Sequence, residues 1–219
     1  MAMTNFQGKS ENALSSFGNR TAKSMNPARI FEQNEQWIKK RLGSDPGYLD
    51  RLSRPQQPSI LYIGCADSRV MPEAFMGAGP GEVFVHRNVG NLVAPGDPNT
   101  GSAVIYGVEH LKVGHIVVCG HYDCGAVKAV LHSEDLGSLE PWLRNLRVVY
   151  QRHQEELDAL PVATDRCDRL VELSVRAQCA NILEFTEVQA SISETGLQVH
   201  GWVFDLRSGR IVDLNVGRE

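Results

Sequence analysis

Three short apolar runs constrain the fold of this chain more than any other feature. They are SILYIGC at 59–65, EVFVHR at 82–87 and HIVVC at 115–119, and each is continuous rather than alternating. Continuous apolar runs of this length are typical of strands that are buried on both faces. Segments with a helical pattern follow the runs, at about 100–112, from 124 onward, at 138–158 and at 165–190. Strands alternating with helices predict an α/β fold, with a mainly parallel β-sheet of four to five strands flanked by helices.

The two ends of the chain add to this core in different ways. The segment LQVHGWVFDLRSGRIVDL (197–214) predicts two strands joined at Ser208 and Gly209, which would give the sheet an antiparallel edge. Near the other end, NPARIFEQNEQWIKKRLG (26–43) predicts a helix that Asn26 caps and Gly43 ends. One face of this helix is apolar: Ile30, Phe31, Trp37, Ile38 and Leu42. We expect a helical arm that packs on a partner subunit, a flexible segment over 1–25, and one domain over 26–219.

Composition narrows the class of protein. The net charge is −4 and the basic residues are scattered, so we expect no nucleic-acid partner. No apolar run reaches the roughly 18 residues that span a bilayer, so we expect no membrane association. The N-terminal segment lacks the apolar centre of a secretory signal, which predicts a cytoplasmic protein, although its Ser- and Asn-rich composition leaves an organelle open. Five cysteines without an export signal favour metal-binding or catalytic thiols over disulfides.

Metal-ligating residue types follow two of the predicted strands. Cys65 ends the first run, and His121 and Cys124 follow the third. The carboxyl ends of neighbouring parallel strands meet, and two sulfurs with one imidazole suit zinc. Each motif alone is more typical of packed core and loop residues, but the three together favour a metal. Neither motif offers a fourth Cys or His, which leaves one position for water, as in catalytic zinc sites.

Asp67 and Arg69 come directly after the first candidate ligand. An arginine can hold a carboxylate through two parallel hydrogen bonds. The carboxylate can then accept a hydrogen bond from zinc-bound water and fix its direction. Two alternatives stay open: Asp67 could itself become the fourth zinc ligand, or the pair could be an ion pair that only stabilises the loop.

Three motifs together resemble the β-class carbonic anhydrases: CADSRV at 65–70, HRNVGN at 86–91 and GHYDCGAV at 120–127. The resemblance runs from about residue 26 to the C-terminus. It implies reversible hydration of CO₂ to bicarbonate and a proton, with zinc-bound hydroxide as the nucleophile. It also implies one Zn²⁺ per subunit, and it assigns the site residues as follows: Cys65, His121 and Cys124 as zinc ligands, Asp67 and Arg69 as the catalytic pair, and Asp67 as the alternative fourth ligand.

The resemblance extends to the substrate cleft and the assembly. It implies that Gln56, Phe84, Tyr106 and the backbone amide of Gly125 bind the substrate. It further implies a homodimer, or a tetramer built of dimers, with the N-terminal helices wrapped around each other. His86 is a candidate for proton transfer, and a structural histidine is the equal alternative.

One departure from the family predicts how the site behaves. A regulated subclass binds a second bicarbonate with Trp and Tyr at the positions of Tyr62 and Phe204. Because Phe204 has no hydroxyl and Tyr62 presents a different donor, we expect Asp67 to stay paired with Arg69 at neutral pH.

The remaining thiols, Cys119, Cys167 and Cys179, are interpreted as packed core residues. Two other functions stay open: hydrolysis of carbonyl sulfide or carbon disulfide on the same scaffold, and a catalytically silent zinc scaffold.

Overall fold

The computed structural model describes residues 26–132 and 135–217 of the chain. These residues belong to two compact units, one within Met1–Ser53 and the other from Arg54 onward. The flexible segment predicted over 1–25 lies outside the described residues. A single domain over 26–219 stays a prediction.

The N-terminal unit holds α1 (Pro27–Ser44) and α2 (Tyr48–Leu52). The Asn26 side chain accepts a hydrogen bond from the amide of Ala28 at 3.0 Å, which confirms the predicted start of the helix. The helix runs one residue past the predicted end at Gly43.

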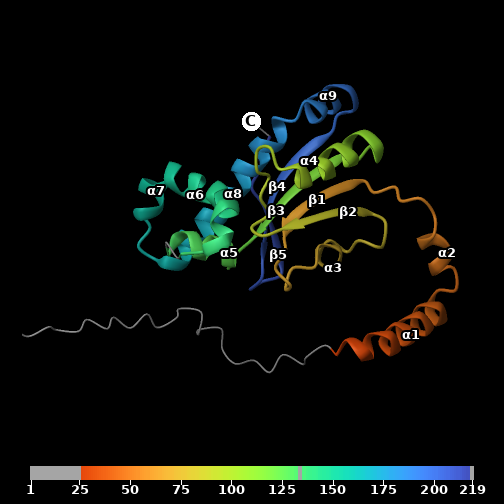
Figure 1. Cartoon of the computed structure of the whole chain (residues 1–219). Coiled ribbons are helices and arrows are strands. Elements are labelled where there is room, and N and C mark those ends of the chain that lie inside the picture. The colour runs from red at the N-terminus through yellow and green to blue at the C-terminus, as the bar shows by residue number, and fades with distance from the viewer. Residues whose placement is uncertain (1–25, 133–134, 218–219) are drawn as a thin grey trace, which may run out of the picture. The chain divides into compact units, whose positions relative to one another are not determined.

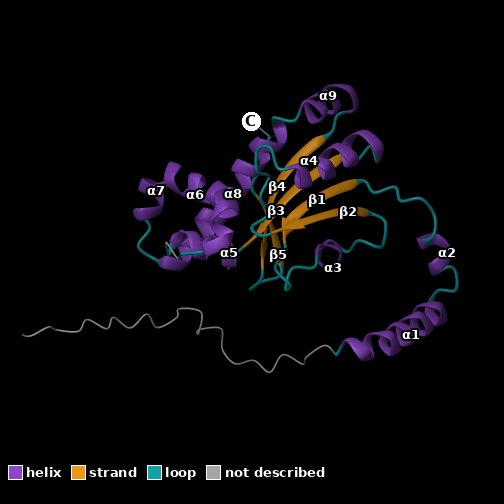
Figure 2. Ribbon diagram, in the orientation of Figure 1, coloured by secondary structure: helices purple, strands orange, loops and turns teal. Residues whose placement is uncertain are grey.

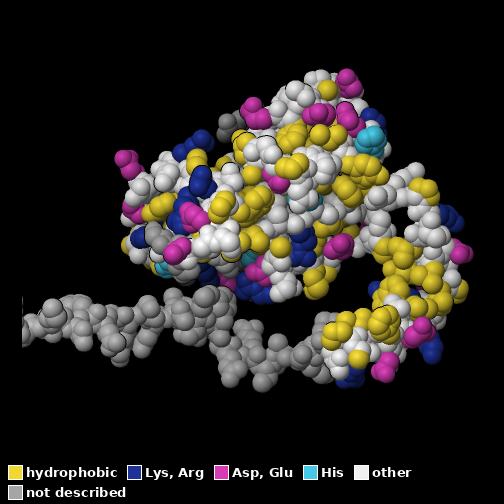
Figure 3. Space-filling model, viewed as in Figure 1, with side chains coloured by type: hydrophobic (Ala, Val, Ile, Leu, Met, Phe, Trp, Pro, Cys, Tyr) yellow, Lys and Arg dark blue, Asp and Glu magenta, His cyan; other side chains and the backbone are white. Residues whose placement is uncertain are grey.

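The apolar face of α1 is open to solvent within this unit. Neither helix has a buried residue, and Phe31 is 79% exposed. Trp37 packs edge-to-face on Tyr48 with 5.8 Å between the ring centroids. Figure 3 shows hydrophobic side chains gathered along this unit. An exposed apolar face of this kind is typical of an interaction surface, and its burial on a partner subunit stays a prediction.

The second unit is built on a five-stranded sheet. Its strands are β1 (Ile60–Cys65), β2 (Val83–Asn88), β3 (His115–His121), β4 (Gln198–Asp205) and β5 (Arg210–Asp213). They lie in the order β2-β1-β3-β4-β5; the first four are parallel, and β5 pairs antiparallel with β4 (Figures 1 and 2). The predicted sheet, its antiparallel edge and the turn at Ser208 and Gly209 are confirmed.

Helices surround the sheet, and their bounds differ from the predicted ones. They are α3 (Pro72–Met76), α4 (Pro98–Ile105), α5 (Gly125–Leu131), α6 (Glu140–Arg152), α7 (Gln154–Asp158), α8 (Ala163–Leu183) and α9 (Thr186–Thr195). A π-helical turn, Tyr106–His110, continues α4. The segment predicted as one helix over 165–190 is divided at Phe185, whose extended backbone lets its ring pack against the core. The short helices α2 and α3 were not predicted.

The two faces of the sheet are covered unequally. The larger core lies on the side of α4, α5, α6 and α8 (Figure 1). On the opposite face Tyr62, Val117 and Cys119 form a smaller cluster, against which Phe75 of α3 packs. Among the described residues, no helix has the length and hydropathy needed to cross a bilayer.

α8 packs closely against the carboxyl end of β3. This helix packs across β3 and β4. A Cβ placed on Gly120 would lie 2.8 Å from Val175 and 3.1 Å from Val171, so the strand approaches α8 closely at this point. The close approach fixes the position of the next residue, His121.

Candidate metal centre

Three ligand atoms meet at the carboxyl edge of the sheet. Cys65 is the last residue of β1, His121 is the last residue of β3, and Cys124 is the N-cap of α5. Their Sγ and imidazole nitrogen atoms lie within 4.8 Å of one another, and all three side chains are buried. Because β1 and β3 are parallel neighbours, their ends bring residues 56 positions apart in sequence to one place. The proximity predicted from the sequence is confirmed.

The chemical state of His121 fits a metal ligand. Its Nδ1 lies 2.9 Å from the carbonyl oxygen of Tyr122, a contact in which Nδ1–H donates. That tautomer leaves the lone pair on Nε2, which is buried and has no hydrogen-bond partner among the described residues. A buried nitrogen without a partner costs free energy, and a metal ion would satisfy it.

The two thiols are hydrogen-bonded to each other. The Cys124 thiol donates a hydrogen bond to the Cys65 sulfur, which lowers the pKa of Cys65 to about 4 against the opposing effect of burial. The same hydrogen bond raises the pKa of Cys124 well above its usual value. A thiolate, a second sulfur and a free imidazole nitrogen form the donor set that zinc prefers. The residues present therefore fit Zn²⁺.

Asp67 and Arg69 form a bidentate pair beside these ligands. Arg69 donates from Nε to Oδ1 at 3.0 Å and from Nη2 to Oδ2 at 2.7 Å, and its backbone amide donates to Oδ1 at 2.9 Å. These bonds lower the pKa of Asp67 to about 2. Asp67 Oδ2 lies 3.7 Å from His121 Nε2, outside the compact group of three ligand atoms. The structure has Asp67 paired with Arg69, and the persistence of this pair beside zinc at neutral pH stays a prediction.

Sequence reasoning missed two residues that support this loop. Arg87 donates from Nε to the carbonyl of Cys65 at 2.9 Å and from Nη2 to the carbonyl of Asp67 at 2.6 Å. Asp123 accepts a hydrogen bond from Nη1 of Arg69 at 3.0 Å. The sequence offered a signal for each: an arginine at the end of a core strand, and a carboxylate between two ligands.

Three of the four predicted substrate residues, Gln56, Phe84 and Tyr106, do not gather at the metal centre of the same chain. The backbone of Ser59 is hydrogen-bonded to Glu82 and His115, where β2 and β3 begin. Ser59 therefore lies at the amino edge of the sheet, roughly 20 Å along β1 from Cys65. Gln56 is exposed and lies three residues before Ser59, a span of at most about 11 Å, so it cannot reach the ligands. Phe84 of β2 pairs with Leu61 of β1, which lies four residues before Cys65. The ring centroids of Phe84 and Tyr106 lie 5.7 Å apart.

Gly125 lies beside a candidate ligand, and the two positions that differ from the regulated subclass, Tyr62 and Phe204, lie in an aromatic cluster. Gly125 is the first residue of α5 and follows the ligand Cys124. Tyr62 is fully buried, and its ring meets Phe75 edge-to-face at 6.3 Å. Phe204 stacks on Phe75 with 4.2 Å between centroids. Three aromatic rings therefore pack together at these positions.

His86 belongs to a hydrogen-bonded network on β2. Its Nε2 lies 3.2 Å from the hydroxyl of Thr100, which in turn donates to Asp97 at 2.7 Å. Partial burial lowers the pKa of His86. These contacts match the structural interpretation of His86, and its part in proton transfer stays a prediction.

The remaining cysteines are buried and protonated. Burial raises the pKa of Cys119 and of Cys179 to about 12, and that of Cys167 to about 11. Cys119 lies in the small cluster on the far face of the sheet, away from the ligands, as expected. A thiol with such a pKa is not nucleophilic near neutral pH.

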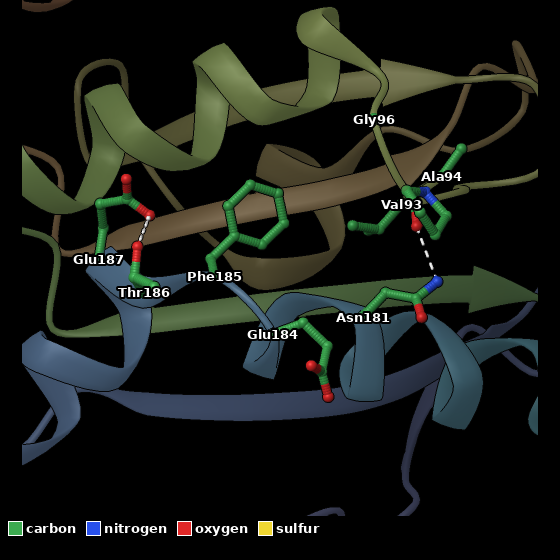
Figure 4. A pocket seen from close by; sticks show the side chains of 9 residues that line it. Val93, Ala94, Gly96, Asn181, Glu184, Phe185, Thr186 and Glu187 are labelled. Carbon is green, nitrogen blue, oxygen red and sulfur yellow. Dashed lines mark hydrogen bonds between the residues drawn. The ribbon is translucent and has the colours of Figure 1, made fainter.

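A separate cavity of about 380 Å³ lies beside the α8–α9 junction (Figure 4). Phe185 projects into it, and Asn181 donates to the carbonyl of Val93 at 2.8 Å across one wall. Gln178 accepts a bond from the amide of Val93 at 2.8 Å. The cavity holds none of the ligands, and Asn181 and Gln178 of α8 hold the loop that follows β2.

Comparison with known proteins identifies the family. Residues 60–211 match the family model described as carbonic anhydrase. A carbonic anhydrase of Emericella nidulans is 50% identical over 189 residues, which cover 86% of this chain and 83% of the relative. A tetrameric β-carbonic anhydrase of Sordaria macrospora superposes with a TM-score of 0.83 and 39% identity, over 86% of this chain and 96% of that one.

The chain belongs to the β-class carbonic anhydrases. A Coccomyxa β-carbonic anhydrase, solved in complex with acetazolamide, superposes with a TM-score of 0.80 and 41% identity, over 87% of each chain. The protein is therefore an enzyme of the reversible CO₂ hydration reaction, and its cofactor is zinc. The group formed by Cys65, His121 and Cys124 fits the zinc that this family uses.

Proposed function

We propose that this β-carbonic anhydrase hydrates CO₂ with Asp67 and Arg69 as its catalytic pair, in a cleft that two subunits complete. One observation carries the proposal: three buried ligand atoms lie within 4.8 Å of one another, and the Asp67 carboxylate lies 3.7 Å from one of them. Cys65, His121 and Cys124 would hold zinc, which supplies Lewis acidity that makes hydroxide available from water near pH 7.

Asp67 orients the water that reacts. Its low pKa keeps the carboxylate ionised over the physiological range, so it accepts rather than donates a hydrogen bond. Arg69 holds both carboxylate oxygens of Asp67, and Arg87 holds the backbone carbonyl of Asp67. A carboxylate held at both oxygens, on a backbone that is itself held, directs the lone pair of the water toward the carbon of CO₂. The amide of Gly125 donates to the developing bicarbonate oxygen.

The substrate wall comes from a second copy of the chain. Gln56, Phe84 and Tyr106 carry the residue types that the cleft needs, but they lie toward the amino edge of their own sheet. Tyr106 is 44% exposed and therefore available to a neighbouring subunit. A homodimer would bring these residues to the partner's carboxyl edge.

Assembly and location complete the proposal. The exposed apolar face of α1 would be covered by a partner subunit, and pairs of dimers would give a tetramer. The relative from Sordaria macrospora is described as tetrameric, which supports this state. We also propose a cytoplasmic location, since all five cysteines are free thiols, as is usual in a reducing compartment.

Stopped-flow assays with a pH indicator test the proposal. The zinc-loaded protein should hydrate CO₂, and it should hydrolyse carbonyl sulfide and carbon disulfide far more slowly. A protein with one zinc per subunit and no hydration activity would be a silent scaffold. Faster turnover of carbonyl sulfide than of CO₂ would move the assignment to the hydrolase. Light scattering at the assay concentration measures the assembly.

A further inference from the structure

The guanidinium of Arg69 has a second carboxylate partner besides Asp67. Its Nη1 donates to Asp123 Oδ2 at 3.0 Å, and its Nη2 lies 3.4 Å from the Asp123 carbonyl oxygen. Lys128 of α5 forms an ion pair with the other carboxylate oxygen of Asp123. The charged groups therefore form a chain in which Lys128 contacts Asp123, Asp123 contacts Arg69, and Arg69 contacts Asp67.

The backbone at Asp123 makes this arrangement informative. Its φ is +65°, in the left-handed region that favours glycine. Aspartate tolerates this region better than most residues, but it still costs free energy relative to glycine. Asp123 accepts this cost in a turn between two metal ligands, where its side chain reaches Arg69 and Lys128. A strained position at a functional site is a reason to look for the role of its side chain.

Arg69 needs a second partner because its surroundings leave it free to move. Its side chain is 48% exposed, and it lines a cavity of about 640 Å³ together with Asp123, Lys128 and Arg207. A long side chain beside open space has many rotamers, and one carboxylate partner restricts only part of that freedom. The Asp123 carboxylate binds Nη1, the guanidinium nitrogen that the bonds with Asp67 leave unused.

We propose that Asp123, tethered by Lys128, is a positioning residue that clamps Arg69 against Asp67 and so keeps the catalytic carboxylate in its reactive orientation. The inference rests on the proposed role of the Asp67–Arg69 pair. Asp123 touches neither zinc nor substrate in this scheme; it acts only through Arg69.

The test uses the zinc-loaded, assembled enzyme and the variant Asp123→Gly. Glycine fits the backbone at φ +65° and removes the carboxylate, so zinc content and thermal unfolding should stay close to wild type. We expect kcat for CO₂ hydration to fall about two- to five-fold, the range of a partly exposed charge pair, at unchanged KM. Asp123→Asn keeps one acceptor for Arg69 and tolerates the same backbone, so it should recover part of the loss.

A second readout follows Arg69 itself. Phenylglyoxal modifies accessible guanidinium groups, and peptide mass spectrometry measures the rate at Arg69. The rate should rise about two- to five-fold in Asp123→Gly and less in Lys128→Met, which loosens the clamp without removing it. A purely structural role of Asp123 would change thermal unfolding but would leave this rate unchanged.

The same cavity supplies a matched control. Asp168 holds Arg207 through a 2.7 Å bond from Nη2 to Oδ2 and makes no described contact with Arg69. Asp168→Asn should speed the labelling of Arg207 and leave both kcat and the labelling of Arg69 unchanged. An equal fall in kcat in this control would overturn the proposal.

The failure of this inference is distinguishable from failure of the proposed function. If Asp123→Gly has wild-type kcat and wild-type labelling of Arg69, Asp123 is not a clamp. Arg69→Met then decides the rest: a loss of kcat leaves the catalytic pair in place, and full activity overturns the pair as well. If Asp123→Gly does not fold, Asp123→Asn and Lys128→Met carry the same test. Wild-type kcat and wild-type labelling of Arg69 in both of these variants would overturn the clamp.

Discussion

A single methyl group at Gly120 should test how firmly α8 holds the metal-bearing end of β3. In Gly120→Ala the new Cβ would lie 2.8 Å from Cγ2 of Val175 and 3.1 Å from Cγ1 of Val171. Separations below about 3.0 Å do not occur for real Cβ atoms, so one element has to move. Both neighbours are β-branched and buried, and valine in a helix has one strongly preferred rotamer, so neither side chain can turn away.

The magnitude follows from the cost of overpacking a dense core. Inserting one methylene into a well-packed site costs about 1–3 kcal/mol. For a chain of this size, each kcal/mol lowers the midpoint of thermal unfolding by about 2–4 °C, so the variant should unfold about 2–12 °C lower. Because Gly120 directly precedes His121, the displaced strand end should also weaken zinc binding.

Thermal unfolding of zinc-loaded protein at one fixed concentration measures the first effect, because bound metal and assembly both raise the midpoint. Dialysis followed by metal analysis measures the second. Gly114→Ala is the matched control, since a Cβ there has no heavy atom within 4 Å and the residue directly precedes the same strand. If both variants unfold at the wild-type temperature and keep their zinc, β3 does not depend on close contact with α8.

Three further outcomes follow from the site. His121→Ala should lose zinc on dialysis because only two sulfur ligands remain, and retained metal with full CO₂ hydration would contradict the ligand assignment. Asp67→Ala should keep its zinc but lose roughly 10- to 100-fold in kcat by stopped flow, as is usual when a group that orients a metal site is removed. Folding lowers the pKa of His86 below its usual 6.5, so protonation favours the unfolded chain. The stabilising contribution of neutral His86 is full above pH 6.5 and declines as the pH falls through the lowered pKa. Urea unfolding between about pH 5 and 7 should therefore show a smaller decline in the free energy of unfolding in His86→Gln than in wild type.

The ligand set was predictable because strand ends fix it. Cys65 and His121 each terminate a continuous apolar run, and parallel pairing of those runs brings the two ends together whatever the loops do. Cys124 follows within one turn of chain. The bidentate pair of Asp67 and Arg69 was predictable because the two residues are close in sequence and the fork of an arginine matches the two oxygens of a carboxylate.

Contacts that depend on a local backbone angle were not predictable. The reach of Asp123 to Arg69 requires the left-handed φ at Asp123, which no pattern of polarity encodes. The division of the long helical pattern at Phe185 is also a tertiary effect, because both flanking segments have helical sequences and the break serves to pack one ring. Local pattern describes the elements well, and packing decides where they stop.

The substrate wall shows a limit of a different kind. Resemblance to the family assigns Gln56, Phe84 and Tyr106 to the same cleft as the zinc ligands, yet the topology places them toward the opposite edge of the sheet. Both statements hold only if the cleft lies between two chains. It follows that dimer dissociation should abolish hydration even if every zinc ligand stays in place, so the dependence of activity on protein concentration reports on the substrate wall rather than on the metal.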